Sequence, residues 1–223
     1  MTEHLEEIFR FLQRDNLDCD MAFRNQPFDI PFDLKPEDFM AFAKEDLKEN
    51  MERSLVNALS NIKRALDCRI ASLLCFFGVY NESRNENWSF PKSTDFLLKT
   101  GVIAPNILKK VNKKRNELEH EFKKPTREEV VDFLDVASLF LGFTSQFLHR
   151  QYLDFDIYPA EVNYPENYDP YPHLSIKLNS KEGIAKLIFF KDPECKEELE
   201  VSVKDEENYV KILRAVVKRI VNR

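Results

Sequence analysis

Two residue types suited to phosphate chemistry lie five positions apart in the chain, Arg115 and His120. Around them, Val111, Leu118 and Phe122 form an apolar stripe at helical spacing. The guanidinium of Arg115 falls in a gap of this stripe, and burying a permanent charge without a partner is costly. An imidazole can accept and donate a proton near neutral pH. The pair therefore suggests a phosphate contact beside a general acid or base.

A plainer interpretation of the same residues stays open. Arg115 could pair with Glu119 one turn later, and His120 could lie on a solvated helix face. Five residues also span about 500° of a helix, so the two side chains diverge by about 140°. They can share one site if it lies between their faces, if the helix end bends, or if a second subunit completes it.

The residues Arg115, Asn116 and His120 resemble the Arg-Asn-x-x-x-His signature of the HEPN superfamily (higher eukaryotes and prokaryotes nucleotide-binding). Its members are all-helical domains, and many are metal-independent endoribonucleases. The order of elements is also similar: a long helix, a connecting segment, the motif helix and a hydrophobic helix. The resemblance covers roughly residues 36–150 and leaves both ends of the chain unexplained.

The resemblance implies a catalytic role for each motif residue. Arg115 would contact the scissile phosphate and offset its developing charge, and His120 would transfer the proton. Asn116 would orient the imidazole or bind the substrate. The expected reaction is attack of the ribose 2′-hydroxyl on the adjacent phosphate, with no metal and no cofactor. Family members pair their motif helices across a two-fold axis, so a homodimer is expected.

The resemblance also bears on regulation and on further site residues. Some members work in toxin–antitoxin or defence-like systems and carry a tyrosine two residues after the histidine, which a partner modifies. Here that position is Phe122, so this modification is not expected. Regulation by another protein remains an expectation. Many members add an acidic residue from an earlier helix. Asp67 and Glu52 are candidates, and no motif singles out either.

Charge is distributed unevenly along the chain. The net charge of −6 argues against a general nucleic-acid coat protein, but eight basic and three acidic side chains lie between Asn106 and Arg127, a local charge of +5. Such an island could attract RNA, or it could be a solvated lysine-rich helix face. The predicted RNA-binding residues are Lys109, Lys113, Lys114, Lys123 and Lys124.

Composition narrows the class of protein. A hydrophobic content of 43% indicates a folded chain, and only four glycines argue against a glycine-rich nucleotide loop. The four cysteines are scattered, which favours reduced thiols over disulfides or a zinc site, and no cluster has metal-ligand spacing. No uninterrupted apolar run reaches the ~18 residues of a spanning helix. We therefore expect a cytoplasmic protein that does not enter a membrane.

The predicted fold class is mainly α: an HEPN-like antiparallel helical bundle with a small C-terminal antiparallel β-meander plus helix. The C-terminal region itself is α+β. Four regions are expected along the chain. They are an N-terminal helix with a Pro/Phe-rich loop (1–35), the bundle (36–150), a Tyr/Pro-rich strap (151–172) and the β-meander plus helix (173–223). The last is too small to stand alone and should dock on the bundle.

Within the bundle region, residues 37–77 hold no glycine or proline, which predicts one very long helix or two with a break near 48–52. The polar stretch 78–93 predicts a loop from which Trp88 and Phe90 fold back onto the helices.

A capping box of Thr126 and Glu129 opens the predicted helix 127–150, which is apolar on most sides. This breadth predicts burial against a second copy of the chain. The strap 151–172 is predicted to be extended, with tyrosines that stack RNA bases or pack onto their own protein.

Three functions are compatible with these patterns. The first is the homodimeric endoribonuclease. The second is a catalytically silent HEPN-like dimerisation module that binds a partner protein or a nucleotide. In the third, the activity lies in the C-terminal meander and the helices are a platform.

Overall fold

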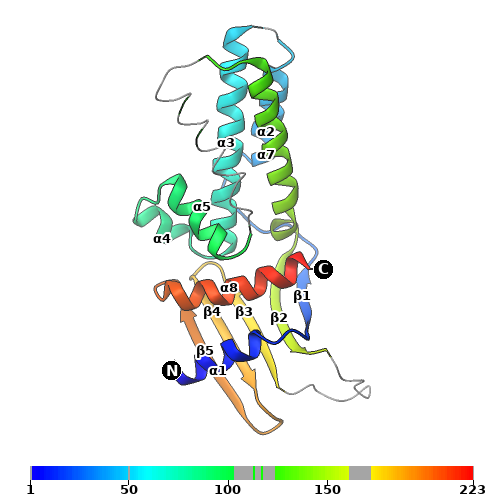
Figure 1. Cartoon of the computed structure of the whole chain (residues 1–223), viewed down its shortest axis with the longest axis vertical. Coiled ribbons are helices and arrows are strands. Elements are labelled where there is room, and N and C mark those ends of the chain that lie inside the picture. Colours follow the sequence, from blue (N-terminus) through cyan, green and yellow to red (C-terminus); the bar gives the residue numbers. More distant parts are fainter. Residues whose placement is uncertain are drawn as a thin grey trace.

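The computed structural model describes residues 2–49, 51–102, 113, 117, 124–160 and 172–222. This part of the chain forms two halves: a helical half, and a sheet half that holds the strands and two further helices (Figure 1). The helices are α1 (Thr2–Leu12), α2 (Pro36–Asp46), α3 (Glu52–Phe76), α4 (Tyr80–Asn85), α5 (Phe90–Lys99), α7 (Arg127–Leu148) and α8 (Glu206–Val221). The strands are β1 (Leu17–Arg24), β2 (Gln151–Pro159), β3 (His173–Asn179), β4 (Ile184–Phe190) and β5 (Lys196–Ser202).

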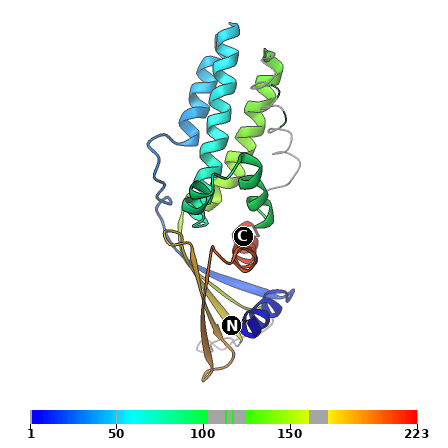
Figure 2. The same ribbon diagram turned by 90° about the vertical axis from the view of Figure 1, so that its left-hand side faces the viewer.

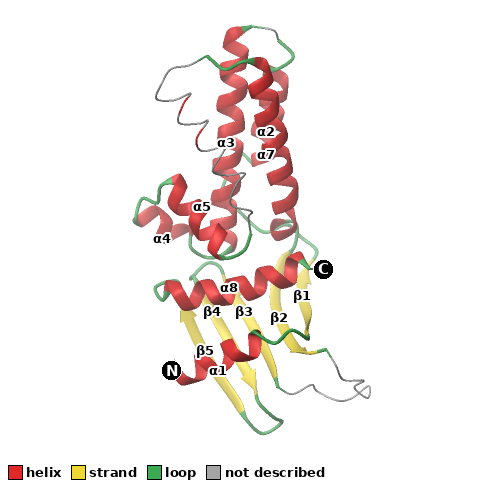
Figure 3. Ribbon diagram, viewed as in Figure 1, coloured by secondary structure: helices red, strands yellow, loops and turns green. Residues whose placement is uncertain are grey.

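The strands form one antiparallel sheet in the order β1-β2-β3-β4-β5 (Figure 3). The mainly α prediction, an HEPN-like helical bundle, is therefore wrong: the protein is α+β, and its sheet has five strands. The two unpredicted strands come from segments expected to be irregular, β1 from the N-terminal loop and β2 from the strap. Their pairing joins distant parts of the chain, with Asp20 opposite Asp156.

One face of the sheet carries the apolar core of this half. Side chains such as Phe155, Ile157, Leu174, Ile176 and Leu187 are buried there. The helices α1 and α8 both lie on this face (Figure 2).

Strand β2 contains the first part of the predicted strap, whose tyrosines were expected to stack RNA bases or to pack onto their own protein. The ring of Tyr152 contacts those of Phe23, Phe76 and Phe155. Tyr152 therefore packs onto its own protein rather than forming a base-stacking platform. Residues 161–171 of the predicted strap lie outside the described residues.

In the helical half, α2 and α7 both pack against α3. Of the two alternatives for residues 37–77, the structure has two helices, because α2 ends at Asp46 and α3 begins at Glu52. The capping box is confirmed too: the Glu129 amide donates to Thr126 Oγ1 (3.2 Å), and the Thr126 amide donates to Glu129 Oε2 (3.0 Å). The predicted loop 78–93 is wrong in part, since it contains α4, which is too short to show a helical period.

A buried cation ties α3 to the start of α2. The side chain of Arg69 is buried, and its guanidinium forms an ion pair with Glu37 in the first turn of α2. Its Nε atom has no hydrogen-bond partner among the described residues. The carboxylate of Glu37 is therefore the group that compensates this charge in the described structure.

The two halves join where α3 ends. The last carbonyls of a helix need partners from outside it. Here Ser180 Oγ donates to the Phe76 carbonyl (2.6 Å) and the buried Tyr209 hydroxyl donates to the Phe77 carbonyl (2.9 Å). The C-terminal end of α3 is thus bonded to the β3–β4 turn and to α8, so the predicted docking of the C-terminal region is confirmed.

Two glycines allow this junction to close. Gly78 follows α3 and Gly183 lies in the β3–β4 turn, both at positive φ (72° and 65°). A Cβ added to Gly183 would lie 2.7 Å from the Gly78 carbonyl oxygen and 2.8 Å from Val203 Cγ1. The backbones therefore approach to a distance that a side chain would prevent.

We expect Gly183→Ala to lower the free energy of unfolding by about 2 kcal/mol or more, because it adds left-handed backbone strain and a backbone clash. Gly142→Ala is the matched control. A Cβ at Gly142 meets nothing within 4 Å, and helix propensity should raise the stability by about 0.5–1 kcal/mol. Urea denaturation at one protein concentration measures the free energy of unfolding of both variants. Equal values would contradict the close approach of Gly183 to Gly78.

Candidate functional site

The motif residues Arg115, Asn116 and His120 lie outside the described residues, as do the predicted RNA-binding Lys109, Lys114 and Lys123. Two described residues flank Arg115 in the chain. Lys113 and Glu117 are both helical, and Lys113 Nζ lies 4.0 Å from Glu117 Oε1. Lys113 is exposed, so its charge is available to solvent on this stretch.

The N-terminal end of the motif segment is set by the end of α5. Gly101, at φ 88°, donates its amide to the Leu98 carbonyl (3.0 Å), and Val102 donates to the Leu97 carbonyl (3.1 Å). These two bonds are those of a Schellman cap, so α5 ends at Gly101. Val102 is buried, and a Cβ on Gly101 would contact Val217 and Arg214 of α8.

The C-terminal end of the motif segment is held at the other end of α3. Lys124 Nζ pairs with Glu52 Oε2 at 2.7 Å, and Arg127 Nη2 donates to the Leu47 carbonyl at 2.8 Å. Both members of the Lys124–Glu52 pair are exposed, so the pair contributes at most about 1 kcal/mol. Its consequence for the site is that Glu52, one of the two acidic candidates, already has a cationic partner.

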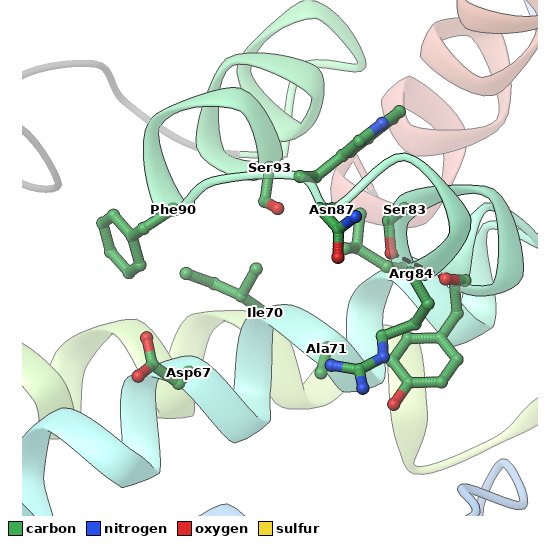
Figure 4. Close-up of a pocket in the computed structure, with 11 residues that line it drawn as sticks. Asp67, Ile70, Ala71, Ser83, Arg84, Asn87, Phe90 and Ser93 are labelled. Carbon is green, nitrogen blue, oxygen red and sulfur yellow. Dashed lines mark hydrogen bonds between the residues drawn. The ribbon is translucent and has the colours of Figure 1, made fainter.

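The other acidic candidate, Asp67, lies at a cavity between α3, α4 and the start of α5 (Figure 4). The cavity has a volume of about 450 Å³. Its lining combines apolar, aromatic and polar side chains, among them Asp67, Ile70, Arg84, Asn87, Phe90 and Ser93. Of the two acidic candidates, Asp67 therefore lines this cavity and Glu52 does not.

Helical spacing explains how α3 provides one wall of the cavity. Asp67, Ile70 and Ala71 are three and four residues apart, so they share one helix face. Asn87 follows α4 at a φ of 51°, a left-handed conformation that asparagine tolerates better than most residues. This residue turns the chain from α4 toward α5.

The opposite wall is tied by its own hydrogen bonds. Ser83 Oγ donates to the Tyr80 carbonyl (2.7 Å), and the Trp88 amide donates to the Ser83 carbonyl (2.8 Å). The Trp88 indole donates to Glu86 (2.7 Å), and its ring lies 5.5 Å from that of Phe96. The predicted folding back of Trp88 onto the helices is confirmed.

A third feature of the helical half is the outer face of α7. Val131, Leu139 and Phe143 are 39%, 70% and 46% exposed there. Among the described helices, α7 alone has the length and apolar composition to cross a membrane. Core helices of water-soluble proteins pass the same test, and α7 packs along α3. Packing against α3 thus accounts for the apolar residues on the inner face of α7. It does not account for the exposed apolar residues on the outer face.

The described residues give little support for a metal site or for a cysteine nucleophile. They contain no group of three or more His, Cys, Asp or Glu side chains that could hold a metal ion. Burial raises the pKa of both Cys19 and Cys75 to about 12. Neither thiol is therefore a suitable nucleophile near neutral pH.

Comparisons of the chain with protein-family models, with curated proteins and with solved structures give no match.

Sequence reasoning missed the polar residues Arg84 and Asn87 at the cavity. The available signal was the aromatic pair Trp88 and Phe90 in a polar stretch. This pair indicated a segment that folds back, without showing that a cavity forms beneath it.

The raised pKa values predict slow alkylation of Cys19 and Cys75 in the folded protein. A thiol with a pKa near 12 is ionised about 1,000-fold less at pH 8 than an ordinary thiol, and the thiolate is the reacting form. Mass spectrometry after brief iodoacetamide treatment at pH 8 should find both unmodified, whereas in urea they should react. Rapid labelling of either in the native protein would contradict their burial.

Proposed function

We propose that this protein is a metal-independent endoribonuclease that acts as a homodimer, with Arg115, Asn116 and His120 as its catalytic residues. The observation that carries the proposal is the Arg-Asn-x-x-x-His motif in the segment between α5 and α7. The proposal rests on the resemblance of these residues to the HEPN signature.

The chemistry assigned to these residues uses the RNA's own nucleophile. The His120 imidazole accepts the proton of a ribose 2′-hydroxyl, whose oxygen then forms a bond to the adjacent phosphorus. The bond from phosphorus to the 5′-oxygen breaks, and a protonated imidazole supplies the proton to that leaving oxygen. Arg115 stabilises the charge on the phosphoryl oxygens in the transition state. The products are a 2′,3′-cyclic phosphate and a 5′-hydroxyl.

Several features support an RNA substrate that binds near the motif segment. The local charge around the motif is +5, although the chain carries −6 overall. Lys113 is exposed, so phosphates could reach it. Asp67, on the long helix that precedes the motif segment, adjoins a cavity.

The outer face of α7 supports the homodimer. Leu139 and Phe143 lie four residues apart and are both exposed, which places two large apolar side chains together on one helix face. A self-complementary contact of this kind is the usual route to a two-fold dimer. It would also allow two motif segments to complete one site, which would answer the divergence of about 140° expected for positions five residues apart on a straight helix.

A catalytically silent dimerisation module would use the same face of α7. The two functions differ in turnover, because only the first predicts cleavage products with cyclic-phosphate ends.

We expect the protein to cleave mixed single-stranded RNA in excess chelator, and His120→Ala and Arg115→Ala to lose at least about 100-fold in rate. His149→Ala is the matched control, since this exposed histidine at the end of α7 bonds only the Ser145 carbonyl among the described residues. End analysis by mass spectrometry checks the products. Cleavage that survives in both motif variants would contradict the assignment.

We also expect Leu139→Lys to dissociate the dimer and to reduce cleavage in proportion, because it places a charge in the apolar contact. Val221→Lys on α8, where the valine is 37% exposed, is the control and should remain dimeric and active. Sedimentation over a range of concentrations measures the oligomeric state. An active monomer of the unmodified protein would refute the dimer.

A further inference from the structure

The cavity between α3, α4 and α5 is large enough to hold a small ligand. Its volume of about 450 Å³ lies within the usual range for small-molecule sites. Ile70, Ala71 and Leu74 give it an apolar wall, while Asn87 and Ser93 add groups that can donate or accept hydrogen bonds. An apolar wall beside a few convergent polar groups fits a flat ring with hydrogen-bonding edges.

The charged groups at the cavity are of opposite sign and lie apart. In Figure 4, Asp67 and Phe90 lie toward one end, and the guanidinium of Arg84 lies toward the other, beside Ala71. A carboxylate accepts hydrogen bonds from amino and imino groups, whereas a guanidinium binds phosphate through a fork of parallel donors. The cavity is therefore suited to a ligand with donors at one end and a phosphate at the other.

The wall residues of this cavity are bonded to one another. The backbone of α4 is joined to Trp88 through Ser83, and Trp88 is held further by Glu86. Lys92 pairs with Glu86 at 2.6 Å and lies 4.6 Å from the centroid of the Trp88 ring. A preformed site avoids the free-energy cost of ordering its walls on binding.

We propose that this cavity binds one unpaired base of an RNA strand with its phosphate, and that it prefers guanine. The base lies against Ile70 with its donor edge toward Asp67, and the phosphate meets Arg84 at the exposed end. Guanine offers an imino and an amino group side by side, which suits a carboxylate, whereas uracil offers a single donor between two carbonyl oxygens. The proposal names a substrate for the proposed ribonuclease and rests on that function.

The chain supplies its own reporter for a binding test. Trp88 is the only tryptophan, and it lines the cavity, so its emission should change when a ring enters. The protein to use is full-length His120→Ala, which keeps the cavity and should not consume RNA. The probes are guanosine 5′-monophosphate, uridine 5′-monophosphate and inorganic phosphate, each followed by fluorescence and by calorimetry.

We expect saturable binding of guanosine monophosphate, at least tenfold tighter than binding of uridine monophosphate or phosphate. Adding Arg84→Ala should weaken binding at least tenfold, and adding Asp67→Asn should abolish the preference for guanine. Arg10→Ala on α1 is the matched control and should bind unchanged, since Arg10 lies in the sheet half. Circular dichroism checks that each variant is folded.

Absence of a calorimetric and fluorescence signal with guanosine monophosphate would overturn the proposal, and so would equal binding by the Arg84→Ala variant. These outcomes are independent of catalysis. If the nucleotide binds as expected but the unmodified protein never cleaves RNA, the proposed ribonuclease fails and the base site stands. If RNA is cleaved with the same base preference in Asp67→Asn as in the unmodified protein, the base site fails and the ribonuclease stands.

Discussion

The structure depends on how the C-terminal end of α3 obtains its hydrogen bonds. A helix leaves its last carbonyls without partners, and here a serine of the β3–β4 turn and a tyrosine of α8 supply them. Close approach of Gly78 to Gly183 makes this possible. Because α2 and α7 pack on α3, and α3 also forms a wall of the cavity, this junction links the helical half to the sheet half, together with the contacts of α5 and α7 with α8.

Local patterns predicted the local features of the fold. The lack of glycine and proline in residues 37–77 predicted the helical stretch that forms α2 and α3, and the capping box predicted the start of α7 at Thr126. The fold class was wrong because strand pairing is not local. In β1, exposed Asp18 and Asp20 alternate with more buried residues, but this pattern is short, and its partner strand lies beyond α7. The prolines and aromatic residues around it indicated a loop instead.

The candidate site was predictable to a similar degree. The motif residues stand out in the sequence because a fixed charge interrupts an apolar stripe. The cavity could not be found in that way, because Asp67, Arg84 and Phe90 come from three helices that only tertiary packing brings together. For the same reason, the sequence left Asp67 and Glu52 equivalent, and the folded structure shows Asp67 at the cavity.

The central claim is that RNA is cleaved by its own 2′-hydroxyl, with Arg115 and His120 acting on it and without a metal ion. The most direct test compares one RNA oligonucleotide with its 2′-O-methyl counterpart, both incubated with the protein in excess chelator. The account predicts that the RNA is cut and that the methylated strand stays intact. Equal cleavage of both strands, or cleavage only after magnesium is added, would contradict it.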